Sequence, residues 1–149
     1  MASFVTQTVK VRGRDNYGSG EYGASRDGGK RQHKGLDIVS NSGQAIYAPI
    51  LGDVTVTRAY SVDSNATKEA MKKDLQCVKI TDSAKKIVVK LMYVKATVRN
   101  GFVSQGQIIG YVQNLGNLYP GITNHVHVEY LVNGNKVHPE ELWQICFNR

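Results

Sequence analysis

Short runs of valine and isoleucine separated by turns most constrain the fold of this chain. Seven such runs cover residues 36–40, 44–50, 53–60, 76–81, 86–94, 102–112 and 125–132. β-Branched and aromatic residues in runs of this length, bounded by glycine or asparagine, are typical of strands. Residues 4–11 alternate enough for an opening strand, and Asn133-Gly134 is typical of a tight hairpin. The pattern predicts a mainly β protein, built as a compact antiparallel sheet or sandwich.

Two segments have helical character. Residues 65–73 are short and polar, as in a helix on the surface. Residues 139–145 begin with Pro139 in the first turn, followed by Glu140 and Glu141 at the positive end of the helix dipole. We therefore expect one domain over residues 1–149, with long loops and a short C-terminal helix. Its length is sufficient to bury a hydrophobic core.

Charge and apolar patterning exclude several function classes. The net charge is +7, but no nucleic-acid motif or interleaving of aromatic and basic residues is present. A basic surface of this kind would attract a polyanionic glycan. No apolar run approaches the roughly 20 residues of a membrane-spanning helix, which predicts no membrane insertion. The first residues lack the pattern of a signal peptide, so either a cytoplasmic protein or one without its leader is expected.

The two cysteines are too few for a disulfide scaffold. Cys77 lies in the apolar run CVKI, and Cys146 lies between isoleucine and phenylalanine. A single bridge between them and two buried thiols are both compatible with this pattern.

Three of the four histidines lie in two short segments. Asp37 lies four positions after His33, a spacing at which two side chains can converge from one helical turn or a tight loop. His125 and His127 lie in the alternating run VHVEYLV, where both would project from the same face of a strand. Two imidazoles and one carboxylate form a ligand set of catalytic zinc sites, which leave the fourth position open. The sequence therefore predicts a bound Zn²⁺ ion, whereas His138 has no companion and is expected to be structural.

The order of motifs resembles the lysostaphin/LytM-type zinc metallopeptidases, which cleave peptides of bacterial cell walls. The motifs are HKGLDI, GQAIYAPILGDVTV, VSQGQIIGYV, GITNHVHVEYLVNG and KVHPEELW, and the resemblance covers roughly residues 20–145. It implies the lysostaphin-type peptidase fold. It also implies zinc held by His33, Asp37 and His127, with His125 beside the metal as general acid/base or transition-state donor.

A closer resemblance concerns GSGEYGASR, AIYAP, VKLMYVKA and LYPGITNHVHVE. These segments are similar to a secreted, cytokine-like animal branch of the same fold, which keeps the zinc site and is not regarded as a protease. This resemblance implies an extracellular protein of innate immunity. However, Ser19 and Ser40 stand where that branch has cysteines, which keeps a cytoplasmic location open.

Active wall peptidases of this type carry a further catalytic histidine in a Tyr-x-His-Leu-like segment. The corresponding stretch, Lys90 to Lys95, contains none. Tyr93 is expected near the metal, but its neutral phenol would be a poor proton shuttle near neutral pH. We therefore expect a non-catalytic signalling or recognition protein. The alternatives are a zinc metalloendopeptidase in which Tyr93 or a water replaces the histidine, and a glycan-binding module with a structural zinc.

The glycine-rich segment 12–34 has no apolar periodicity and leads directly to His33. A loop this long in a compact domain is usually functional. We expect it to form one wall of a groove across the zinc face, with residues 115–124 as the opposite wall. Tyr17, Tyr22 and Tyr119 would then offer contact surfaces to a peptide or to a protein receptor.

Overall fold

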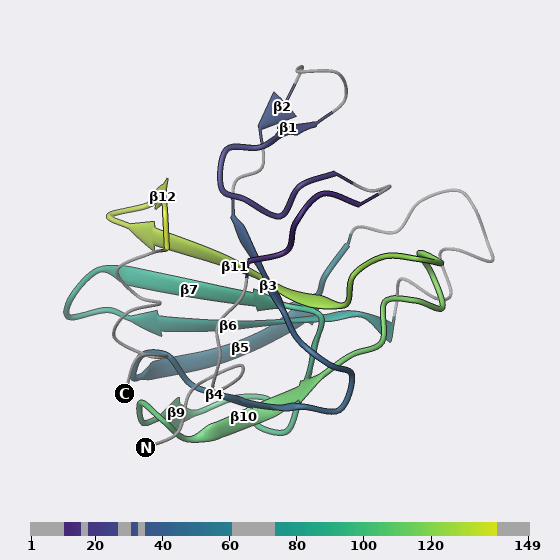
Figure 1. Cartoon of the computed structure of the whole chain (residues 1–149). Coiled ribbons are helices and arrows are strands. Elements are labelled where there is room, and N and C mark those ends of the chain that lie inside the picture. The colour runs from purple at the N-terminus through teal and green to yellow at the C-terminus, as the bar shows by residue number, and fades with distance from the viewer. Residues whose placement is uncertain (1–10, 16–17, 27–30, 33–34, 61–73, 140–149) are drawn as a thin grey trace.

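The computed structural model describes residues 11–15, 18–26, 31–32, 35–60 and 74–139 (Figure 1). Within these ranges the chain is built from strands. They are β1 (Ser25–Arg26), β2 (Arg31–Gln32), β3 (Leu36–Val39), β4 (Ala45–Tyr47), β5 (Gly52–Arg58), β6 (Gln76–Asp82), β7 (Ile87–Met92), β8 (Val94–Ala96), β9 (Phe102–Val103), β10 (Ile108–Val112), β11 (His125–Val132) and β12 (Asn135–Val137).

The largest sheet has seven strands in the order β12-β11-β7-β6-β5-β9, and β3 pairs with β11 beside this path. A second sheet has the order β4-β10-β8, and β1 and β2 form a separate hairpin that stands apart from both (Figure 1). All strand pairings of the described residues are antiparallel. The predicted antiparallel, mainly β architecture is therefore confirmed.

β11 positions the site because it contacts three other strands. Its first half pairs with β3, its second half pairs with β12, and its other edge pairs with β7. The register of the β3 pairing places His127 opposite Asp37, although 90 residues separate them in the chain. A shift of this register by one residue would move every side chain of β3 to the other face, so the sheet pairing itself fixes this contact.

Two apolar clusters fill the interior. The larger one contains buried aliphatic residues from both larger sheets, such as Ile38, Ile80, Leu91 and Ile109. The smaller one contains Leu75, Tyr93 and Leu115, with Tyr60 and Tyr119 among the partly buried residues packed against it. The smaller cluster thus joins the end of β7 to the loop before β11.

Some predicted elements differ from the structure or lie outside it. The run 102–112 divides into β9 and β10, because a turn at Gly106, which has a φ of 86°, interrupts it. The run 86–94 likewise divides at Tyr93, whose φ is 74°. The helix expected at 65–73, nearly all of the C-terminal helix at 139–145, and the opening strand at 4–11 except Val11 lie outside the described residues.

Cys77 is buried as a free thiol, and burial raises its pKa to about 11, while Cys146 lies outside the described residues. No helix in the described ranges is long and apolar enough to cross a membrane.

Candidate metal centre

Asp37 and His127 form the centre of the site. His127 Nδ1 lies 2.8 Å from Asp37 Oδ1, and both side chains are buried. The chain approaches the imidazole very closely on one side, because a Cβ atom added at Gly35 would lie 2.6 Å from His127 Nε2 and Cε1. Glycine at this position therefore leaves the space that the His127 ring occupies.

Glu129 lies two residues beyond His127, on the same face of β11, and fixes the other side of the ring. His127 Nε2 and Glu129 Oε2 are 2.9 Å apart, and Lys136 on β12 lies 3.2 Å from Glu129 Oε1. Burial opposes the charged form of His127, but the bonds to Asp37 and Glu129 outweigh it and raise its pKa to about 9. Burial likewise opposes the charged form of Glu129, but His127 and then Lys136 lower its pKa to about 2.

The donor atoms of this pair suit zinc. Carboxylate oxygen and imidazole nitrogen are zinc ligands, and two ligand atoms of a tetrahedral zinc ion lie roughly 3.3 Å apart. Asp37 Oδ1 and His127 Nδ1, at 2.8 Å, need only a small opening to reach that separation. Glu129 would then accept a hydrogen bond from the remaining ring nitrogen, as carboxylates do behind metal-bound histidines. His33, the third predicted ligand, lies outside the described residues, and within the described ranges no three His, Cys, Asp or Glu side chains are arranged so that they could hold a metal ion.

His125 lies beside this pair. Its Nδ1 is 2.7 Å from the carbonyl oxygen of Thr123, and its Nε2 is 3.4 Å from Asp37 Oδ2. Burial lowers the pKa of His125, with the charge of Asp37 opposing that effect. With Nδ1–H donated to Thr123, Nε2 carries a lone pair on the side of the predicted metal. The structure therefore brings Asp37, His125 and His127 together.

Tyr93 contacts the ring of His125. The two rings meet edge to face, with centroids 5.4 Å apart, and the Tyr93 hydroxyl lies 2.6 Å from the hydroxyl of Tyr60. Burial raises the pKa of both tyrosines, so both phenols are neutral at physiological pH. Sequence reasoning placed Tyr93 near the metal but missed Tyr60, because 33 residues separate the two tyrosines and no motif links them.

Arg12 was also missed. Its guanidinium is buried and lies 3.0 Å from Asp37 Oδ2, so that a positive charge adjoins the predicted metal ligand. The spacing of 25 residues between the two gives no motif that could have revealed the pair. In contrast, Glu129 could have been found, because it continues the alternation of His125 and His127 along β11.

The segments predicted to form a groove are only partly described. The backbone of Arg12 and Gly20 is hydrogen-bonded to Asp37, which places this part of the 12–34 segment beside the site. Tyr22 packs against His138 and donates to the carbonyl of Lys136, so it covers the β11–β12 hairpin. Tyr17 lies outside the described residues. The groove and its occupant remain predictions.

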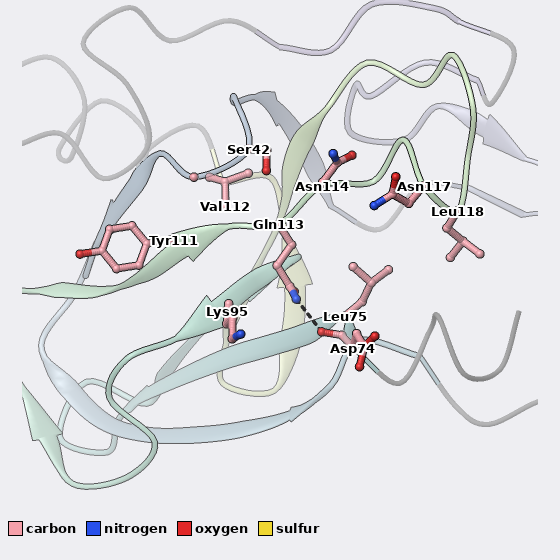
Figure 2. Close-up of a pocket in the computed structure, with 11 residues that line it drawn as sticks. Ser42, Asp74, Leu75, Lys95, Tyr111, Val112, Gln113, Asn114, Asn117 and Leu118 are labelled. Atoms are coloured by element: carbon pink, nitrogen blue, oxygen red, sulfur yellow. Dashed lines mark hydrogen bonds between the residues drawn. The ribbon is translucent and has the colours of Figure 1, made fainter.

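A cavity of about 380 Å³ is lined in part by Asn117 and Leu118 (Figure 2). Its lining also includes Tyr111 from β10, Gln113 just after β10, Lys95 from β8, and Asp74. Gln113 donates its side-chain amide to the carbonyl of Asp74, so two of the lining residues are hydrogen-bonded to each other (Figure 2). Neither Asp37 nor the two site histidines line it, so it is separate from the candidate metal centre.

The chain belongs to Peptidase family M23, whose model matches residues 31–139. It is 31% identical over 120 residues to leukocyte cell-derived chemotaxin-2 of Mus musculus, covering 80% of this chain and 72% of the relative. It is 34% identical over 123 residues to myeloid protein 1 of Gallus gallus, covering 82% of this chain but only 35% of that longer protein. The predicted similarity to the chemotaxin-2 branch of the M23 fold is confirmed.

Solved structures confirm the lysostaphin-type fold. The catalytic domain of lysostaphin from Staphylococcus simulans superposes with a TM-score of 0.58 at 22% identity, covering 87% of this chain and 90% of that domain. A zinc-containing peptidase from Vibrio cholerae gives a TM-score of 0.60 at 17% identity, covering 91% of this chain and 38% of that protein. Zinc thus occurs in a protein that shares this fold.

Proposed function

We propose that this protein is a zinc-binding recognition module on the M23 peptidase fold that does not cleave peptides. The carrying observation is the pair of neutral hydroxyls, Tyr60 and Tyr93, next to His125. Hydrolysis of an amide needs a proton acceptor for water and a donor for the developing oxyanion. His125 can serve as one of these groups, and a buried phenol with a raised pKa is a poor proton acceptor.

The residues that would hold zinc are His33, Asp37 and His127. When bound, zinc would act as a Lewis acid that lowers the pKa of water and polarises a carbonyl group. Glu129 would keep the His127 ring oriented through Nε2, with Lys136 neutralising that carboxylate. His125 would hold its lone pair on Nε2 beside the metal, because Thr123 accepts the proton on Nδ1.

The similarity to chemotaxin-2 supports an extracellular, cytokine-like role in innate immunity. The partner would be a protein receptor or a peptide at the zinc face, and the net charge of +7 would also favour a polyanionic glycan. Because the chain spans only part of its relatives, these partners belong to the proposal.

A zinc endopeptidase acting on bacterial wall peptides is the second candidate. The observation in its favour is that His125 keeps its Nε2 only 3.4 Å from Asp37 Oδ2, where it could act as the proton acceptor for water. Tyr93 or a water would then have to replace the absent histidine as donor to the developing oxyanion.

The deciding experiment compares zinc content with peptide release. Purified protein is loaded with zinc, and its metal content is measured by elemental analysis before and after mild dialysis. Cleavage of peptidoglycan and of pentaglycine is followed with lysostaphin as positive control. We expect about one retained zinc per chain and no cleavage. If the unmodified protein cleaves either substrate and His125→Ala does not, the protein is an endopeptidase. If the unmodified protein retains no zinc, the metal-binding part of the proposal is wrong.

The Tyr93→His variant sharpens this comparison. The substitution places an imidazole at the position of Tyr93, next to His125, and leaves the residues in contact with Asp37 unchanged. Cleavage by this variant but not by the unmodified protein would show that the absence of the second histidine prevents hydrolysis in the unmodified protein.

A further inference from the structure

All three nitrogen atoms of the buried Arg12 guanidinium make polar contacts. Its Nε donates to Asp37 Oδ2 at 3.0 Å, and Nη2 lies 3.0 Å from the same oxygen. Its Nη1 donates to Asp15 Oδ1 at 2.8 Å and to the carbonyl oxygen of Gly18 at 3.0 Å. Only 3% of the residue is exposed. Because both contacts to Asp37 use Oδ2, the other oxygen, Oδ1, faces His127.

The contacts of Arg12 begin a series of contacts that leads back to Asp37. Asp15 Oδ2 accepts a hydrogen bond from the backbone N–H of Thr123 at 3.1 Å. The carbonyl of Thr123 accepts a hydrogen bond from His125 Nδ1 at 2.7 Å, and His125 Nε2 lies 3.4 Å from Asp37 Oδ2. This series therefore links Arg12 to the second site histidine through the segment that precedes β11.

The backbone around Arg12 is packed to fit this arrangement. Arg12 donates its N–H to the carbonyl of Asp37 at 2.8 Å, and Asp37 donates its own N–H to Gly20 at 2.8 Å. A Cβ atom at Gly20 would lie 2.6 Å from Cβ of Arg12 and 2.7 Å from Cβ of Asp37. The glycine thus allows the 12–20 segment to lie directly against β3.

We infer that Arg12 is a positioning residue of the metal site, held in place by Asp15. Arg12 binds Oδ2 of Asp37, so that only Oδ1 is directed at the metal. Through Asp15, it also connects this carboxylate to the loop that orients His125. This inference rests on the proposed zinc site. A lysine could supply the same charge but not two parallel donors together with a third toward Asp15, because the planar guanidinium alone has this fork.

The test measures zinc affinity by competition with a chromophoric chelator, and coordination geometry by the visible spectrum of the cobalt(II)-loaded protein. Arg12→Lys keeps the charge and removes the fork. We expect zinc affinity to fall by about 10- to 100-fold, as when other groups behind metal ligands are changed, with altered cobalt band positions or intensities. Arg14→Lys is the matched control, because Arg14 is exposed in the same segment, and it should change neither quantity.

The outcomes separate the inference from the proposed function. A parent that binds zinc, together with an Arg12→Lys variant of equal affinity and identical cobalt spectrum, would overturn the role of Arg12 alone. A parent that does not bind zinc would overturn the proposed function and the inference with it. If Arg12→Lys does not fold, Asp15→Asn replaces it. That variant removes the charge that holds Nη1, and an unchanged affinity and spectrum there would also refute the inference.

Discussion

The neighbours of His125 fall into two groups of different chemistry. The first group, the charged side, consists of groups in direct contact, with Asp37 between Arg12 and His127. The second group, the tyrosine side, consists of the neutral hydroxyls of Tyr60 and Tyr93. The charged side offers anionic and nitrogen donors to a cation, whereas the tyrosine side offers no group that takes up a proton near neutral pH. The proposed function therefore assigns metal binding to the charged side and leaves hydrolysis without a second histidine.

The largest effect should follow from changing the centre of the charged side. Asp37→Asn removes the carboxylate that pairs with both Arg12 and His127. We expect zinc retention to be lost and the metal-free protein to be destabilised by about 3–5 kcal/mol, because the buried Arg12 loses a partner. Elemental analysis and urea unfolding measure the two effects. Asp53→Asn, at an exposed position, is the control, and full zinc content in Asp37→Asn would contradict the site.

Gly35→Ala should have the next largest effect. The new Cβ atom would lie 2.6 Å from the His127 ring and 2.6 Å from the carbonyl oxygen of Val128, which belongs to the sheet and cannot readily move. We expect a destabilisation of about 1–3 kcal/mol, with displacement of the imidazole. Gly13→Ala, where the added atom meets nothing within 4 Å, is the matched control. Thermal unfolding that is equal in the two variants would show that the ring has free space.

The charged side should also give the metal-free protein a characteristic dependence on pH. The pKa of His127 is raised to about 9 from 6.5, so its contribution is complete below pH 6.5 and is lost as the pH rises toward 9. The pKa of Glu129 is lowered to about 2 from 4.5, so its contribution is complete above pH 4.5 and is lost as the pH falls toward 2. Stability from this pair should therefore be greatest between pH 4.5 and 6.5.

Both shifts include the contact between His127 and Glu129, so they are not added, and we expect each decline to be on the order of 1–3 kcal/mol. Urea unfolding of the metal-free protein at several pH values measures these declines. Glu129→Gln should remove the acid limb but only weaken the alkaline limb, since Asp37 still pairs with His127. The tyrosine side should contribute no dependence in this range, because burial raises the pKa of Tyr60 and Tyr93. A flat profile in the parent would refute the ion pair.

The smallest effect is expected on the tyrosine side. Tyr93→Phe removes one hydroxyl from the contact with Tyr60 and keeps the ring against His125. We expect the free energy of unfolding to fall by about 1 kcal/mol and the zinc affinity to stay unchanged. Tyr111→Phe, at a position that is 43% exposed, should leave stability unchanged. A large fall in zinc affinity in Tyr93→Phe would show that the two sides are coupled, and it would refute the view that the tyrosine side plays no part in metal binding.

The strands were predictable because alternation and β-branched residues reflect burial on the two faces of a sheet. β11 begins and ends as expected, at His125 and Val132. Gly106 was expected to mark a turn, but the division at Tyr93 was not expected within its apolar run, because a positive φ is set by the local backbone and leaves the hydrophobic pattern nearly unchanged. Residue type therefore predicted the existence of strands better than their ends.

The site was predictable where its residues share one element. His125 and His127 alternate along β11, and Glu129 continues that pattern and could have been included. Arg12 and Tyr60 could not have been inferred in this way. Their contacts to Asp37 and Tyr93 arise from sheet pairing and loop packing between distant segments, and no spacing in the chain records them.

The pairing of Asp37 with His127 has a consequence for biosynthesis. The two residues are 90 positions apart, with β5, β6 and β7 between them, so the contact cannot form until β11 has been synthesised. Contacts of such long range form late and slowly. A nascent chain that still lacks β11 has Asp37 without the opposing imidazole, and ribosome-bound fragments ending before residue 125 should not acquire the ion at this site. Under the proposed function, metal loading would therefore follow the synthesis of β11.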